Sequence, residues 1–175
     1  MTNKVSGYGA DFALVKKEGN RTIIGYEKNA VEGSDLYVWY EVYFYKSIPT
    51  IHQVKDAIFN DINSQTDNEI LCGLDYTIKH GADQGKQVKL WLSDANQNNI
   101  HAQCSAGTIF PWRYKVAEDN GAPVYEEFAD ATELSTVSDM ITNYVHQCQE
   151  DGWARKDAID WGPYEDALEH LTPNE

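Results

Sequence analysis

The stretch LYVWYEVYFY at residues 36–45 is the strongest strand signal of the chain, and it predicts a β-strand with two different faces. One face carries Leu36, Val38, Tyr40, Val42 and Phe44. Apolar residues at every second position are typical of a strand side that packs on a core. The stretch is preceded by EGSD at residues 32–35 and followed by a proline at residue 49, and both interrupt strands. The sequence therefore predicts one long strand, with this face buried.

The opposite face of the same strand is aromatic and polar-tipped, and it allows two interpretations. It carries Tyr37, Trp39, Tyr43 and Tyr45 around Glu41. Either a neighbouring layer covers these side chains, or they form a contact surface. An exposed aromatic face would suit a protein partner or a sugar ring, since flat rings give much contact area for few frozen torsions. The four aromatic residues are the possible partner-contact residues of this sequence.

Helices are predicted on the C-terminal side of this strand. Thr50 and Gln53 have the spacing of a capping box, and an apolar stripe follows at three- and four-residue steps (Ile51, Val54, Ile58, Ile62). A second short helical turn is expected from Asp67 to Cys72, ending at Gly73. A further helix is expected from residue 93 or 94 to about 106, before Gly107.

The longest predicted helix lies in the last third of the chain. Thr132 is its expected N-cap, and it ends before Gly152. Its apolar stripe consists of Leu134, Val137, Ile141, Val145 and Cys148. One or two short helices are expected after it.

Two β-hairpins are expected between these helices. In the first, alternating residues 74–79 pair with residues 88–93 across a turn that contains Gly81 and Gly85. In the second, a strand from Pro111 carries an apolar face of Trp112, Tyr114 and Val116, and the turn at Asn120-Gly121 leads to its partner around residues 123–125.

Together these elements predict an α+β fold with a mainly antiparallel sheet, two longer helices and short C-terminal helices. The length of 175 residues fits a single domain, residues 1–175. Residues 1–20 lack a sustained period and are predicted to be an irregular N-terminal arm or an irregular strand. Residues 151–175 are predicted to be an acidic closing segment.

The charge excludes some classes of partner. The net charge is −14, and residues 126–175 hold 13 of the 28 acidic residues but only two of the 14 basic ones. Such a field repels phosphate backbones and anionic lipid, so we expect neither nucleic-acid nor membrane binding. No apolar run approaches the ~18 residues that span a bilayer, and the N-terminus does not resemble an export signal. Cys72, Cys104 and Cys148 are accordingly expected to be reduced and buried.

The sequence contains three candidate catalytic or metal sites. His101, Cys104, His146 and Cys148 could form a zinc site only if two helices faced each other, and neither His/Cys pair carries a CxxC partner. Cys104 with His101 is a weak candidate for a thiol nucleophile and base. Asp157 and Asp160 could do acid–base chemistry but lie among other charges. We expect no enzymatic activity, no catalytic residues, no metal and no cofactor.

Four stretches carry a resemblance to a known family. They are WYEV (39–42), LWLSDANQNN (90–99), PWRYKV (111–116) with Tyr125 and Phe128, and DGWARKDAIDWGPY (151–164). In this order and spacing they resemble a domain-of-unknown-function family of tailed bacteriophages and prophages of gut bacteria, commonly encoded among tail and tail-fibre genes. The resemblance covers roughly residues 36–170. It carries over no catalytic residue.

The resemblance implies a structural or tail-assembly protein of the virion, made in the bacterial host cytoplasm, whose partners are other phage structural proteins or further copies of itself. A different class of function is an acidic phage regulatory or anti-defence protein that binds a basic host protein. An enzyme, using Cys104 or a carboxylate pair, is the third hypothesis.

Overall fold

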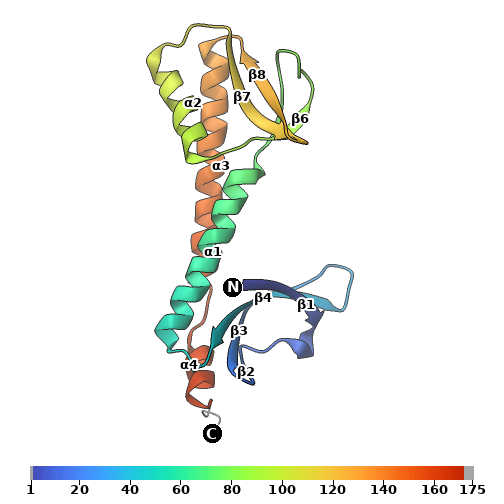
Figure 1. The fold of residues 1–175 in the computed structure, drawn as a ribbon, viewed down its shortest axis with the longest axis vertical. Coiled ribbons are helices and arrows are strands. Elements are labelled where there is room, and N and C mark those ends of the chain that lie inside the picture. Colours follow the sequence, from blue (N-terminus) through green and yellow to red (C-terminus); the bar gives the residue numbers. More distant parts are fainter. Residues whose placement is uncertain (1, 172–175) are drawn as a thin grey trace. The chain divides into compact units, whose positions relative to one another are not determined.

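The computed structural model describes residues 2–171, and their contacts fall into two compact units. Unit 1 comprises residues 1–63 and 155–175, and unit 2 comprises residues 64–154. Helices α1 (Ile51–Gly73) and α3 (Ala131–Asp157) contribute residues to both units (Figure 1). Each unit has its own hydrophobic cluster, and the expectation of a single domain stays a prediction.

The central element of unit 1 is a four-stranded antiparallel sheet in the order β1-β4-β3-β2 (Figure 1). Its strands are β1 (Thr2–Tyr8), β2 (Val15–Glu18), β3 (Arg21–Ala30) and β4 (Leu36–Tyr45). Strand β4 has the predicted bounds and lies between β1 and β3, so its backbone is hydrogen-bonded on both sides. A register shift between Tyr26 and Asn29 marks a bulge in β3.

One face of this sheet packs on helices, as the alternation of β4 predicts. Val42 and Ile24 are buried against Val54, Ile58 and Ile62 of α1. Tyr164 of α4 (Gly162–Glu169) completes the cluster, and its hydroxyl donates to the carbonyl of Gly25 at 3.0 Å. Leu36, at the end of the same face of β4, is exposed.

The prediction of an irregular arm over residues 1–20 is wrong. Strand β1 pairs with β4 along its whole length, and β2 pairs with β3. A short 3-10 helix, η1 (Gly9–Asp11), connects this region. The mixture of small, charged and apolar residues in these strands gives no alternating pattern by which the sequence could identify them.

Unit 2 contains both predicted hairpins and the predicted helix between them. The hairpins are β5 (Asp75–Thr77) with β6 (Gln87–Lys89), and β7 (Trp112–Asp119) with β8 (Ala122–Phe128). Helix α2 (Asp94–Ala106) starts at Ser93, whose side chain accepts from the amide of Asn96, and ends at Gly107 in the left-handed conformation that favours glycine. Asn96 and Gln97 donate from their side-chain amides to the carbonyls of Trp91 and Leu92.

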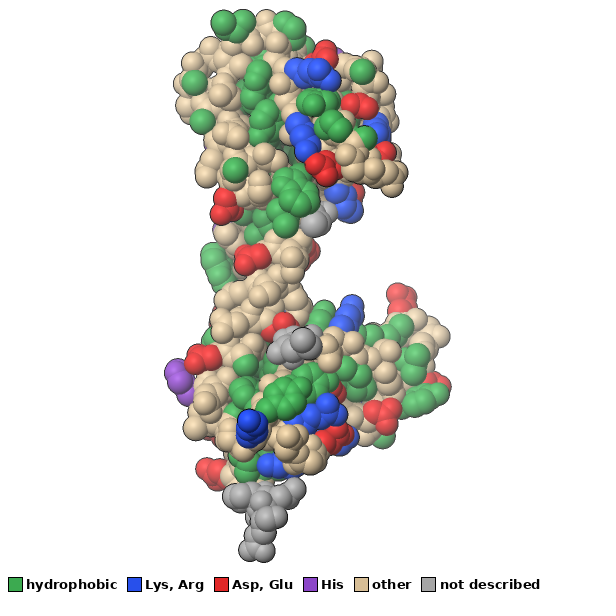
Figure 2. Space-filling view, in the orientation of Figure 1, with side chains coloured by type: hydrophobic (Ala, Val, Ile, Leu, Met, Phe, Trp, Pro, Cys, Tyr) green, Lys and Arg blue, Asp and Glu red, His purple; other side chains and the backbone are tan. Residues whose placement is uncertain are grey.

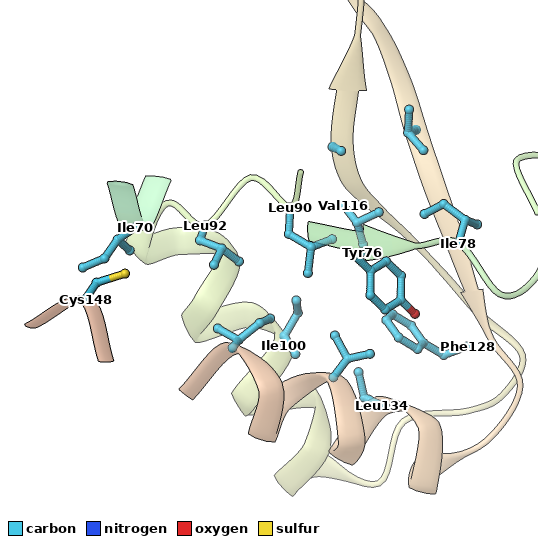
Figure 3. Close-up of a cluster of buried hydrophobic side chains, with 14 residues drawn as sticks. Ile70, Tyr76, Ile78, Leu90, Leu92, Ile100, Val116, Phe128, Leu134 and Cys148 are labelled. Atoms are coloured by element: carbon cyan, nitrogen blue, oxygen red, sulfur yellow. The ribbon is translucent and has the colours of Figure 1, made fainter. Parts of the chain in front are cut away.

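The core of unit 2 is a single buried cluster to which α2, α3 and both hairpins contribute (Figure 3). Leu134 and Ile141 of α3 are almost fully buried, as the predicted stripe requires, with Tyr76 and Phe128 packed in the same cluster. Figure 3 shows Leu134, Tyr76 and Phe128 converging from a helix and two hairpins.

Two predicted helix ends are wrong. Helix α1 continues without a break to Gly73, so the separate turn at residues 67–72 does not exist. Helix α3 passes through Gly152 and ends at Asp157, and Asp130 rather than Thr132 accepts hydrogen bonds from its first amides. Gly152 is needed for close packing: a Cβ there would lie 2.6 Å from the hydroxyl oxygen of Thr66. Trp153, which follows Gly152 in α3, is exposed.

The predicted fold class is confirmed. Residues 2–171 form four α-helices and eight strands in antiparallel sheets, which is an α+β fold. No helix in this range combines the length and apolar character needed to cross a bilayer.

Replacing Ile141 by Asp is expected to unfold unit 2. Ile141 is fully buried, and an unpaired carboxylate there costs several kcal/mol against a total stability of about 5–15 kcal/mol. Met140→Asp is the matched control, because Met140 is the adjacent residue in the sequence and its side chain is partly exposed. Thermal melting followed by near-ultraviolet circular dichroism measures both variants. A cooperatively melting Ile141→Asp protein would contradict the assignment of this core.

Candidate partner-contact surface

The outer face of the unit 1 sheet, opposite α1, carries the four predicted partner-contact residues. Tyr37, Trp39, Tyr43 and Tyr45 lie on this side of β4. Their cross-strand neighbours on β3 and β1 are small, apolar or charged. Residues of β1, β3 and β4 therefore share this face, and its four aromatic residues differ in solvent exposure.

Trp39 is covered by the chain itself and is not available to a partner. Its side chain is 2% exposed, and its indole meets the ring of Phe12 edge-on at 5.9 Å between centroids. Gly7 lies close to the indole: a Cβ at Gly7 would come 2.9 Å from a Trp39 ring carbon. A Cβ at Gly25 would meet the carbonyl of Ala13 at 2.5 Å. Residues 12 and 13 thus cover the centre of this face, which corrects the prediction for Trp39.

Glu41 holds the aromatic side chains around it. Its two carboxylate oxygens accept hydrogen bonds from the Trp39 indole at 2.9 Å and from the Tyr43 hydroxyl at 2.6 Å. The hydroxyl of Tyr43 also accepts from the amide of Asn3 at 3.4 Å. Burial and the bond to Glu41 raise the pKa of Tyr43 above its usual value. The Tyr43 ring is therefore fixed in place while part of the side chain stays accessible.

The end of the face near Tyr45 is open. Tyr45 is 59% exposed, and its cross-strand neighbour is Arg21. The guanidinium of Arg21 lies 5.5 Å from the Tyr43 ring centroid and donates to Glu18. Lys16 and Arg21 together lower the pKa of Glu18 to about 2, so this carboxylate stays charged. At the other end, the Lys28 ammonium lies 4.5 Å from the centroid of the half-buried Tyr37 ring.

The candidate metal and thiol residues have other partners or surroundings in residues 2–171. No three His, Cys, Asp or Glu side chains of this range are grouped to hold a metal ion. His101 contacts Ser138 at 2.6 Å, and His146 pairs with Glu150 one helical turn away. Cys148 is buried, as expected, and burial raises the pKa of its thiol, whereas Cys104 is exposed. The placement of the Cys72 side chain lies outside what the structure describes.

Many carboxylates of the acidic segment have structural partners. Asp160 accepts from the amide of Gly162, and Glu165 lies 3.5 Å from Lys55. Asp157 and Asp160 are exposed at the end of α3 and beyond it. Figure 2 shows acidic side chains scattered among hydrophobic and basic ones on the visible face.

A buried carboxylate in unit 2 was missed by the sequence analysis. Glu126 is 1% exposed and accepts from the Tyr76 hydroxyl at 2.8 Å and from the amides of Lys79 and His80 at 2.8 and 2.9 Å. Burial and this bond raise the pKa of Tyr76. The alternation of β8 places Val124, Glu126 and Phe128 on one face, and that was the available signal.

Next to it, His80 contacts Glu133 at 2.8 Å between Nε2 and Oε1. Glu133 raises the pKa of His80 above 6.5, and His80 with the amide of Ala129 lowers the pKa of Glu133 below 4.5. The pair links the turn after β5 to the start of α3.

The His80–Glu133 pair is expected to stabilise unit 2 most between about pH 4.5 and 6.5. The stabilisation that the charged Glu133 carboxylate contributes is lost as pH falls through the lowered pKa of Glu133. The stabilisation that the His80 imidazolium contributes is lost as pH rises through the raised pKa of His80. The melting-temperature difference between wild type and His80→Gln should therefore shrink above this range. His146→Gln, at a surface histidine, is the control. A difference that does not change with pH would contradict an ionic contribution.

Trp39→Ala is expected to destabilise unit 1 by about 3–5 kcal/mol, because it leaves a cavity beneath Phe12. Tyr45→Ala, on the same face but exposed, should change the free energy of unfolding by less than about 0.5 kcal/mol. Melting and self-association are measured on the same samples. An unchanged melting temperature with impaired association in Trp39→Ala would show that Trp39 is a contact residue.

Comparisons of this chain with models of protein families, with curated proteins and with solved structures give no significant match.

Proposed function

We propose that this chain is a non-enzymatic structural or tail-assembly protein of a tailed bacteriophage, acting through protein–protein contacts in the virion. The observation that carries the contact part of the proposal is the open end of the outer face, where Tyr45 is 59% exposed beside the fixed ring of Tyr43. The resemblance of residues 36–170 to a phage family supports the phage part.

The side chains of this surface need little further ordering when a partner binds. Tyr43 is held by Glu41 and Asn3, and Arg21 lies over its ring. Side chains that are already ordered lose less entropy when a partner binds, so more of the contact energy appears as affinity. Tyrosine and arginine are also the residues that most often dominate interface energies. Exposed carboxylates at the surface contribute much less.

The proposed contact residues are therefore Tyr43 and Tyr45, with Arg21 added and Trp39 removed from the set predicted by the sequence. Tyr37 is half-buried under Lys28 and belongs to the edge of the surface. The partner is another phage structural protein or a second copy of this chain.

Tyr45→Ala is expected to weaken association by about 2 kcal/mol, roughly 30-fold, without lowering the melting temperature. Tyr8→Ala is the matched control: Tyr8 is 64% exposed but lies opposite Leu36, on the other face of the sheet. Light scattering measures self-association, and mass spectrometry of purified particles identifies the chain and any cross-linked partner.

A strictly monomeric protein that is absent from purified particles would refute the proposal. Capture of a basic host protein whose affinity falls steeply with salt would instead favour the regulatory function.

A further inference from the structure

Unit 2 contains an open cleft of about 390 Å³, which is in the size range of small-ligand sites, roughly 300–1,000 Å³. Its lining comes from the segment after β6, from the first turn of α2 and from β7. The lining residues are Trp91, Asn96, Tyr114, Lys115, Ala117 and Glu118. None of them belongs to the contact surface of unit 1, so the cleft is a separate feature.

Trp91 gives the cleft a flat aromatic wall whose position is set by the backbone. The amide of Trp91 donates to the carbonyl of Val116 at 2.9 Å, and its own carbonyl accepts from the side chain of Asn96 at 2.8 Å. The side chain nevertheless stays 48% exposed. Because Trp91 lines the cleft, part of its indole is open to a ligand.

Asn96 supplies a polar group of fixed orientation. Its Oδ1 accepts from the Tyr114 hydroxyl at 2.9 Å, while its Nδ2 donates to Trp91. The Tyr114 hydroxyl also accepts from Asn99 at 3.4 Å. A side-chain amide has two donor hydrogens and two acceptor lone pairs, so one of each is left over. Because its other bonds hold the amide, these two groups cannot rotate away from a ligand.

The charged groups of the cleft cancel each other. Lys115 and Glu118 form an ion pair, and both are about half exposed. Ala117, which is 1% exposed, contributes a small side chain to the lining, next to the register shift between residues 115 and 117. The cleft therefore offers an ammonium and a carboxylate to a ligand without a net local charge.

We propose that this cleft binds a neutral, hydroxyl-rich ligand, namely a hexose unit of a glycan. The C–H groups on one face of a sugar ring are weakly positive and suit the electron-rich face of an indole. Neighbouring hydroxyls both donate and accept, which matches the free donor and acceptor of Asn96 and the Lys115–Glu118 pair. A phosphorylated ligand is disfavoured by the net charge of −14. An acyl chain would leave the polar lining unpaired.

The test uses the full chain and a panel of neutral trisaccharides built from glucose, mannose, galactose or N-acetylglucosamine. The indole N–H resonances are followed by NMR, with Trp91 assigned from Trp91→Phe. At least one trisaccharide should shift the Trp91 resonance with a dissociation constant of about 0.1–1 mM. Trp91→Ala, which lacks this indole, is followed through the backbone amide resonances of residues 114–118, and it should weaken that binding by at least about 10-fold. Trp153→Ala is the matched control, since Trp153 is a similarly exposed tryptophan of unit 2 outside the cleft.

Glu118→Gln provides a second variant at an exposed position, and it should weaken binding several-fold with an unchanged melting temperature. The proposal is overturned if no trisaccharide shifts the Trp91 resonance up to about 10 mM, or if Trp91→Ala binds as wild type does. It is also overturned if Nα-acetyl-arginine amide shifts the resonance and the sugars do not, since the cleft would then be a cation site.

Discussion

The structure of unit 1 depends on covering both faces of strand β4. Val42 on one face is 4% exposed and Trp39 on the other is 2% exposed, so the strand is buried from two sides. Helix α1 covers the first face, and Phe12 with Ala13 covers the second. Only glycine at residues 7 and 25 lets the chain approach this closely. The aromatic face is consequently closed at its centre and open only towards Tyr45, which determines where a partner can bind.

In unit 2, a buried carboxylate fixes the segment between β5 and β6 against β8. Glu126 points into the core, where an ion without partners would be strongly destabilising. Two amides of the turn after β5 and the Tyr76 hydroxyl satisfy it. The same contacts fix that turn against β8, beside His80 and Glu133. A charge that is costly to bury thus gives the irregular segment between β5 and β6 a defined conformation.

Much of the fold could be predicted from local sequence patterns. The features that could not be predicted share a physical reason. The bounds of β4 and α2, and the Thr50–Gln53 capping box, depend on residues close in sequence, and they are as predicted. Strand β1 is ordered by β4, a strand distant in sequence, as in the pairing of Val5 with Trp39. The burial of Trp39 and Glu126 depends on the same long-range contacts. Alternation identifies which side chains share a face, but the covering segment is set by tertiary packing.

Both proposed surfaces differ in charge from the chain as a whole. Arg21 and Lys16 surround Glu18 beside Tyr43, and Lys115 pairs with Glu118 beside Trp91. The aromatic groups therefore lie where basic residues offset acidic ones, although acidic residues are twice as numerous in the chain. A partner that binds through such a surface gains from the aromatic area and does not need to be basic. This local balance of charge favours contact through aromatic side chains. The net charge alone would instead suggest that acidic side chains bind a basic protein.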